Sequence, residues 1–220
     1  KMKRTLYPVA KKFHQLDLPF STGTLEQSSV YEFSHNEIIQ EEAGTLTHLY
    51  VILEGKAKII KSQANGKRSI LQFLHSGDFI GDLTLVSAEK TPKEVLAIGP
   101  TVCLALPIDH AKQVLMQDID FVKMISQYIG DKLIRRMEHF SINQTYQLNY
   151  RLALLLLEVA VAGIYQEKLT ETAEYLGVSY RHLTYTLKTF KENDCVYRES
   201  RGYRINEANL KQLIRSMQRE

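Results

Sequence analysis

Short runs of apolar and β-branched residues, separated by turn-forming residues, fill residues 28–108. The segment "YVILEGKAKIIKS" holds two such runs on either side of Gly55, and "TVCLALP" is a further run that ends at Pro107. Asn65-Gly66 predicts a hairpin turn, because both central residues of a type I′ turn need positive φ. Short strands at a spacing of about ten residues predict a sandwich or barrel rather than βαβ units.

After Pro107 the hydrophobic spacing becomes helical. "DHAKQVL" predicts a short helix that Asp109 can cap. Residues 118–144 follow, about 25 of them helical, which makes a rod of roughly 37 Å. Apolar side chains recur there every three or four residues, at Phe121, Ile125, Ile129, Leu133, Met137 and Phe140. One apolar stripe on so long a helix predicts pairing with a second copy of the chain. The alternative is packing against its own β domain.

The C-terminal part predicts two short helices and a hairpin. A further helix begins near Asn149, two shorter ones cover "TETAEYLG" and "SYRHLTYTLKTFKEN", and Arg201-Gly202 predicts a hairpin turn. Ala173 suits a close helix crossing, Gly177 a turn with positive φ, and Ser179 an N-cap. This spacing is typical of a helix-turn-helix.

In a helix-turn-helix, the second helix enters the DNA major groove with its first residues on base edges. Here those residues are Tyr180, Arg181, Thr184 and Tyr185, while Lys188 suits phosphates. Residues 179–204 carry six Lys and Arg against three Asp and Glu, so this region alone has the +3 net charge of the whole chain. Arg201 in the hairpin would touch the DNA backbone.

The remaining residue types argue against several other kinds of protein. Cys103 and Cys195 form no metal-spaced pair and no disulfide framework, which fits a reducing cytoplasm. No apolar run approaches the roughly 18 residues of a membrane span. His35, Glu37 and His48 are the sole hint of a metal enzyme, and no His-x-His pair accompanies them. We therefore expect a cytoplasmic protein with no catalytic residue, no metal and no membrane contact.

Three segments, taken in order, resemble the CRP/FNR family of bacterial transcription regulators: "LYVILEGKAKIIK", "GKRSILQFLHSGDFIGDLTLV" and "LGVSYRHLTYTLKTFKENDCV". The segment "SYRHLTYTL" most resembles the YeiL-like branch of the family. The resemblance implies an α+β fold with an N-terminal double-stranded β-helix (a jelly roll of the cyclic-nucleotide-binding type) over residues 1–117. A dimerisation helix over 118–147 and a C-terminal winged helix-turn-helix over 148–220 would follow. The implied partners are double-stranded DNA with a near-palindromic site, a second copy of the chain, and RNA polymerase.

The segment "GDFIGDLTLV" resembles the phosphate-binding corner of the family's effector domain. The implied effector pocket contains Gly81, Asp82, Leu83, Lys93 and Arg136. In cyclic-AMP-binding members, a Glu binds the ribose and a following Arg-Ser pair holds the phosphate. Here Asp82 replaces the Glu, and Pro92-Lys93-Glu94 stands near the Arg-Ser position, so no Arg remains for a bidentate grip.

These departures argue against cyclic AMP as the effector. Arg136 and Met137 also stand where the dimer helix would supply a Thr and a Ser to the base. Two cysteines are too few for an iron-sulfur cluster, and the scattered histidines do not support haem. The cofactor therefore stays unknown, and a signal at the β domain would act on DNA binding through the long helix.

A different interpretation makes the chain a ligand-binding module whose helical end contacts protein, since tyrosines also suit protein interfaces.

If the chain does bind DNA, its target sequence should differ from that of most relatives. Many of them begin the recognition helix with Arg-Glu-x3-Arg or Val-Glu-x3-Arg, whereas Tyr180, Arg181 and Tyr185 stand at the matching positions here.

Overall fold

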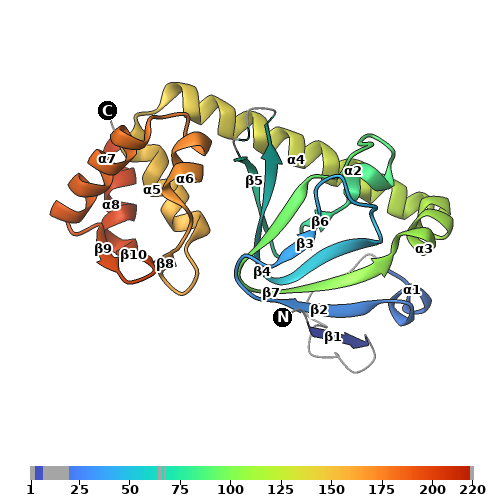
Figure 1. Cartoon of the computed structure of the whole chain (residues 1–220). Coiled ribbons are helices and arrows are strands. Elements are labelled where there is room, and N and C mark those ends of the chain that lie inside the picture. The colour runs from blue at the N-terminus through green and yellow to red at the C-terminus, as the bar shows by residue number, and fades with distance from the viewer. Residues whose placement is uncertain (1–2, 7–19, 64–65, 67, 219–220) are drawn as a thin grey trace. The chain divides into compact units, whose positions relative to one another are not determined.

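The computed structural model describes residues 3–6, 20–63, 66 and 68–218. They form two compact units, one of Lys1–Lys61 and Leu71–Arg135, the other of Ser62–Ile70 and Arg136–Glu220. Strands dominate the first unit and helices the second (Figure 1). The elements in chain order are β1 (Lys3–Leu6), α1 (Thr22–Glu26), β2 (Ser29–Phe33), β3 (Ile38–Gln40), β4 (His48–Ser62), β5 (Arg68–His75), β6 (Phe79–Ile80), α2 (Asp82–Leu85), β7 (Glu94–Pro107), α3 (Ile108–Gln113), the 3-10 helix η3 (Leu115–Gln117), α4 (Ile119–Thr145), α5 (Leu148–Val159), β8 (Ile164–Tyr165), α6 (Leu169–Tyr175), α7 (Tyr180–Glu192), β9 (Val196–Glu199), β10 (Gly202–Ile205) and α8 (Glu207–Met217).

The strands of the first unit form one folded sheet in the order β1-β2-β7-β4-β5, with β3 paired to β7 and β6 paired to β4. The paired strands are antiparallel, as Tyr31 opposite Cys103 in β2 and β7 illustrates. Strand β4 continues through Gly55, and its register with β7 shifts between Ile52 and Glu54 and again between Glu54 and Lys56. Gly55 has φ of 91°, and a Cβ there would lie 2.5 Å from the carbonyl oxygen of Pro100. The predicted jelly roll and α+β class are confirmed.

Alternating side chains of β4 build two hydrophobic cores. Leu49, Val51 and Leu53 join a cluster that includes residues of α3 and α4. Tyr50 and Ile52, between them in the sequence, join a second cluster with residues of β2, β5 and β7. This follows from the two-residue repeat of a strand, which sends successive side chains to opposite faces.

In helix α4, part of the apolar stripe that we assigned to a dimer contact packs within the chain itself. Phe121 and Ile125 were expected to face a second copy of the chain, but they are 2% and 1% exposed in the first core cluster. The packing alternative is therefore right for the N-terminal turns of α4. Further along the helix, large apolar side chains are exposed at Leu133, Ile134, Met137 and Phe140.

One predicted turn and one cap differ in detail, and a second predicted turn is described only in part. Asp109 lies in the first turn of α3, after Pro107 as N-cap, so it does not cap the helix itself. Of the predicted Asn65-Gly66 turn, Gly66 has positive φ, whereas Asn65 lies outside the described residues. The wing hairpin turns at residues 200–201, one position earlier than predicted, because Gly202 already pairs with Glu199.

The second unit contains the C-terminal part of α4, helices α5 to α8 and the small sheet β8-β10-β9. Helix α5 is its central element, since seven of its twelve residues are buried. Helix α8 packs along α5, where the side-chain amide of Gln218 just beyond its C-terminal end donates to the hydroxyl of Tyr150 at 3.1 Å. The sequence of helices followed by a small sheet is that of a winged helix-turn-helix.

Candidate functional site

Helices α6 and α7 are joined by the short turn of a helix-turn-helix. At the end of α6, the N–H of Gly177 donates to the carbonyl of Glu174 at 3.1 Å, and Gly177 has φ of 65°. A left-handed residue at this position is the common way to end a helix, and glycine takes it without strain. The hydroxyl of Ser179 then accepts the N–H of His182 at 3.1 Å and caps α7, as predicted.

Helix α7 has one buried and one exposed face. Tyr180 and Tyr185 are 53% and 70% exposed, and Arg181 and Lys188 are exposed beside them. Thr184 is half-buried, and its hydroxyl donates to the carbonyl of Arg181 at 3.0 Å. The opposite face is buried at Leu183, Thr186, Leu187 and Phe190. The five predicted contact residues of α7 therefore share one surface.

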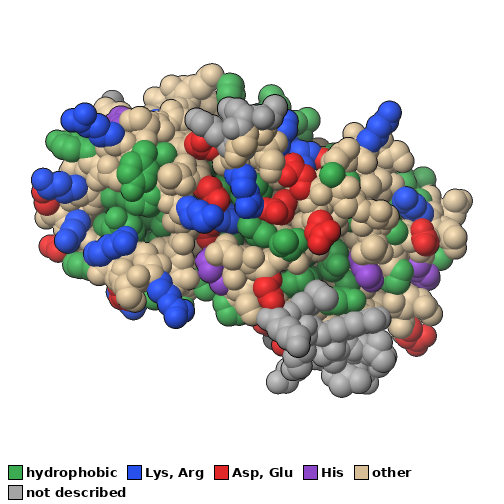
Figure 2. Space-filling view, in the orientation of Figure 1, with side chains coloured by type: hydrophobic (Ala, Val, Ile, Leu, Met, Phe, Trp, Pro, Cys, Tyr) green, Lys and Arg blue, Asp and Glu red, His purple; other side chains and the backbone are tan. Residues whose placement is uncertain are grey.

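Positive side chains surround this exposed face. Figure 2 shows Lys and Arg around α7 and the wing, with exposed green side chains, a class that includes Tyr, between them. Lys188 lies 3.8 Å from Glu192, and both side chains are mostly exposed, so water and salt screen the pair. Lys188 can exchange this partner for a phosphate at little cost.

The wing is a three-stranded sheet in which Gly202 has an essential position. A Cβ at Gly202 would lie 2.0 Å from the carbonyl oxygen of Tyr165 in β8, so only glycine fits. Arg201 is exposed at the turn, and the guanidinium of Arg198 lies over the ring of Tyr203. Arg204, by contrast, is paired with Glu199. Arg198 and Arg201 are therefore the better placed wing cations for a backbone phosphate.

A polar cluster holds the end of α6 in place. Arg151 of α5 donates to the carbonyl of Leu176 at 2.6 Å, and Asn143 of α4 donates to that of Tyr175 at 3.4 Å. These carbonyls end a helix and have no partner within it, so the side chains complete their hydrogen bonds. His139 lies against the ring of Tyr175 with centroids 4.4 Å apart. Burial, and then the charge of Arg151, lowers the pKa of His139.

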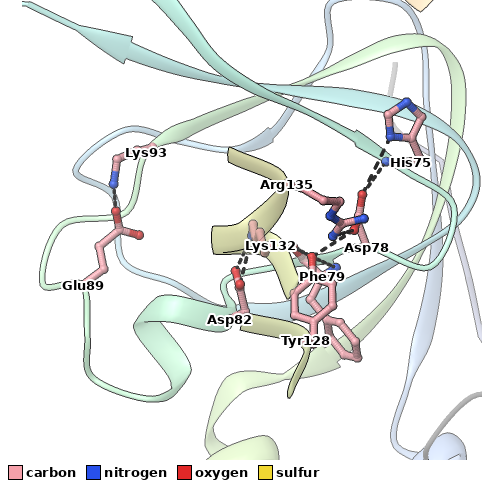
Figure 3. Close-up of polar contacts among 9 residues, drawn as sticks. All are labelled: His75, Asp78, Phe79, Asp82, Glu89, Lys93, Tyr128, Lys132 and Arg135. Carbon is pink, nitrogen blue, oxygen red and sulfur yellow. Dashed lines mark hydrogen bonds and ion pairs between the residues drawn. The ribbon is translucent and has the colours of Figure 1, made fainter. Parts of the chain in front are cut away.

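In the first unit, the predicted effector corner already holds a buried ion pair. Asp82, in the first turn of α2, accepts two hydrogen bonds from the ammonium of Lys132 in α4, at 3.0 and 2.9 Å (Figure 3). The two side chains are only 5% and 9% exposed. The ring of Tyr128 lies 5.4 Å from the same ammonium.

A second acid at the corner, Asp78, is also bound to α4. One of its oxygens accepts from the guanidinium of Arg135 at 3.1 Å and from the hydroxyl of Tyr128 at 3.2 Å (Figure 3). The other oxygen accepts the backbone N–H of His75 at 2.8 Å. The Tyr128 oxygen in turn accepts the backbone N–H of Phe79. Burial, and then the charge of Asp78, raises the pKa of Tyr128.

The structure brings together some of the predicted effector residues. Gly81 has φ of 93° and precedes α2, in which Asp82 is buried and Leu83 half-buried. Lys93 forms an ion pair with Glu89 (Figure 3). Arg136 is exposed and belongs to the other compact unit, and the residue of α4 that binds Asp82 is Lys132.

Sequence reasoning missed the residues of α4 that contact the corner, although their spacing carried a signal. Tyr128, Lys132 and Arg135 continue the interval of three and four residues that begins at Phe121 and Ile125. These five residues therefore lie along one face of the helix, which we call the inner face. An apolar stripe that continues as Tyr, Lys and Arg indicates a helix that passes from a core to buried acids.

Three comparisons place the chain among known proteins. A model of the cyclic nucleotide-binding domain matches residues 30–118. Regulatory protein YeiL of Escherichia coli O157:H7 is 33% identical over 88% of this chain and 88% of its own length. The fold is similar to that of FixK2 from Bradyrhizobium japonicum, with a TM-score of 0.63, 19% identity, and coverage of 84% of this chain and 96% of that one.

A CRP/FNR-family transcriptional regulator from Thermus thermophilus is also similar, with a TM-score of 0.67, 18% identity, and coverage of 86% and 99% of the two chains. Within the described part of the chain, no helix is long and apolar enough to cross a membrane. The same residues contain no group of three or more His, Cys, Asp or Glu that could hold a metal ion. On the strength of its match to YeiL and of the shared fold, the chain belongs to the CRP/FNR family of transcription regulators.

Proposed function

We propose that this regulator binds DNA through α7, whose exposed face carries Tyr180, Arg181, Tyr185 and Lys188. The N-terminus of this helix is capped by a side-chain hydrogen bond. The observation that carries the proposal is this face, because tyrosines that are 53% and 70% exposed gain nothing from the protein's own core. Arg181 suits bidentate hydrogen bonds to guanine, and Tyr185 suits contact with a thymine methyl. Ser179 and Thr184 lie near base edges, while Lys188 and Arg201 contact phosphates.

The protein acts as a homodimer in this proposal. Leu133, Met137 and Phe140 are more than half exposed and lie at helical spacing on α4, which we call the outer face. Water contact with so many large apolar side chains is unfavourable, and a second α4 can cover them. Two α7 helices related by a two-fold axis would read a near-palindrome with half-sites about 34 Å apart.

Several finer points belong to the same proposal. Residues 1–117 form the β-roll sensor domain, 118–147 the dimerisation helix and 148–220 the DNA-binding domain. A bacterial regulator of this kind works in the cytoplasm, has RNA polymerase as a further partner and catalyses no reaction. Cyclic AMP is not its effector, because Asp82 and Lys93 are each paired within the protein.

A selection of binding sites from random double-stranded DNA tests the proposal. We expect enrichment of a near-palindrome with two equal half-sites. Repeating the binding at rising salt separates DNA from a protein partner, because phosphate contacts release counterions and weaken steeply with salt. If no sequence is enriched, with or without cell extract to supply a signal, the chain is better described as a module that contacts protein.

A further inference from the structure

We propose that Lys132 acts as a built-in effector: it fastens α4 to the corner around Gly81 and Asp82, so that this regulator adopts its DNA-binding state without a small charged ligand. The inference deepens the proposed function and rests on it. It names the residue that does at this corner what an added ligand would otherwise do.

The charges around the corner are neutralised in pairs. Asp82 is bound by Lys132, Asp78 by Arg135, and Lys93 by Glu89 (Figure 3). An incoming anion such as a cyclic phosphate would have to displace Glu89 from Lys93 and would also approach Asp82. The first step separates an existing ion pair, and the second brings the anion toward a carboxylate that lies out of water.

Burial makes the Lys132 contact costlier to break than a surface ion pair, because loss of one partner leaves a buried charge without its counter-ion. Lys132 reaches both oxygens of Asp82, and the side chains are 9% and 5% exposed. By contrast, Lys123 and Asp120 on the same helix lie 4.0 Å apart with side chains 70% and 90% exposed. Water competes fully for that exposed pair and hardly at all for the buried one. The two pairs thus form a matched test and control.

The backbone is closely packed at the corner that receives Lys132. Gly81 has φ of 93°, and a Cβ there would lie 3.0 Å from the side chain of Leu46, so the backbone is packed closely before α2. On the helix side, Tyr128, Lys132 and Arg135 are spaced by four and three residues and contact neighbouring acids. Three consecutive anchors determine both the position of α4 and its rotation about its axis.

This rotation matters for DNA binding because α4 is one helix from Ile119 to Thr145. The inner face ends at Arg135, and the outer face with Leu133, Met137 and Phe140 begins in the same turn. A helix held by its inner face therefore presents its outer face in a defined direction. We infer that the chain itself sets the geometry of the dimer, and hence the separation of its two recognition helices.

Chemical rescue of a Lys132→Ala variant provides the test. The full-length variant leaves Asp82 without its ammonium partner, so we expect its affinity for the selected DNA to fall about tenfold or more. Added n-propylammonium chloride, which supplies an ammonium on a short alkyl chain, should restore much of the loss. Sodium chloride at the same ionic strength should not. Wild-type protein and the control Lys123→Ala should bind fully without the amine and gain nothing from it.

Hydrogen exchange gives a readout that does not depend on DNA. We expect amides of α2 and of residues 128–135 to exchange faster in Lys132→Ala than in wild-type protein, and n-propylammonium to slow them again. If wild-type protein selects no DNA, the proposed function fails, while exchange still decides whether Lys132 fastens α4. If Lys132→Ala is unfolded by circular dichroism, Lys132→Gln replaces it, and weaker DNA binding than wild type is again expected.

Two results overturn the inference. One is a folded Lys132 variant with wild-type DNA affinity and wild-type exchange in α4. The other is a wild-type protein whose affinity for the selected DNA rises when cyclic AMP or cyclic GMP is added, because the corner would then still accept an anionic ligand.

Discussion

At the scale of single residues, the exposed face of α7 differs from most DNA-reading helices in its two tyrosines. Side chains that discriminate bases in the major groove are mostly Arg, Lys, Asn and Gln. Here Arg181 is the one guanidinium on this face, with Tyr180 before it and Tyr185 one turn later. Base discrimination should therefore depend strongly on Arg181, while the tyrosines add contact area and thymine contacts.

Arg181→Ala and Lys188→Ala should separate base reading from phosphate binding. Arg181→Ala should cost about 1–3 kcal/mol at the preferred half-site and relax the preference at one base pair. Lys188→Ala should weaken all sequences about equally and lower the slope of log affinity against log salt by about 1. Binding to a set of single-base variants of the selected site, measured at several salt concentrations, checks both. An equal loss across all sequences for Arg181→Ala would refute its role.

Gly202 is the residue on which the wing depends most directly. Gly202→Ala would place a Cβ 2.0 Å from the Tyr165 carbonyl, so β10 must move away from β8. We expect the free energy of unfolding to fall by about 2 kcal/mol or more. Gly130→Ala is the matched control, since it lies inside α4 with nothing within 4 Å of its Cβ. Replacing a helical glycine should raise stability by about 0.5–1 kcal/mol. Urea denaturation of both variants measures the difference.

At the scale of elements, the polar cluster at the end of α6 connects three helices of the second unit. Arg151 comes from α5, Asn143 from α4, and their acceptors are carbonyls of the last residues of α6. The turn to α7 follows directly, so these two side chains help to position the recognition helix. They are positioning residues, because they do not lie on its exposed face.

Arg151→Met should weaken specific binding more than non-specific binding. It leaves the Leu176 carbonyl without its donor, which should cost about 1–3 kcal/mol of stability. A tilted α7 loses base contacts but keeps its charge, so the ratio of specific to non-specific affinity should fall. Arg151→Lys, which keeps one donor, should recover part of this ratio. Arg215→Met on the exposed side of α8 removes the same charge and should leave it unchanged.

The half-buried position of His139 predicts a loss of stability on acidification. Its pKa is lowered in the folded protein, so the unfolded chain binds a proton more readily. The free energy of unfolding should then decrease as pH falls through the ordinary histidine pKa of about 6.5. His139→Gln should flatten this part of the stability curve. Denaturation of wild-type protein and of this variant at a series of pH values measures the difference.

Elements were predictable from the sequence where local chemistry decides them. Ser179 caps α7 and Gly177 takes positive φ because of bonds within the same few residues. The pairing of Lys132 with Asp82 joins residues fifty positions apart, and the tertiary fold alone brings them together. For the same reason, the sequence could not show that Phe121 faces the protein's own core, while Met137 faces out. The spacing of apolar residues along a helix does not by itself show which surface covers them.

At the scale of the whole molecule, the outer face of α4 should determine the oligomeric state. Phe140→Asp places a charge among the exposed apolar residues that we assign to the dimer contact. A buried, unpaired carboxylate opposes association, so the mass measured by sedimentation should fall toward that of one chain. Val114→Asp, at the 45% exposed residue that ends α3, is the control and should leave the mass unchanged. A Phe140→Asp protein of unaltered mass would exclude this surface as the contact.

Helix α4 has its anchoring residues and its exposed apolar residues on different faces. The number of residues between the two sets therefore determines the angle between those faces. Each residue inserted after Arg135 would rotate everything beyond it by about 100°. One added residue would thus turn Met137 and Phe140 away from the direction of Leu133. Seven added residues would nearly restore the alignment while lengthening the rod by about 10 Å. Relatives in which this part of the helix is longer or shorter should therefore differ by about seven residues, which is close to two helical turns.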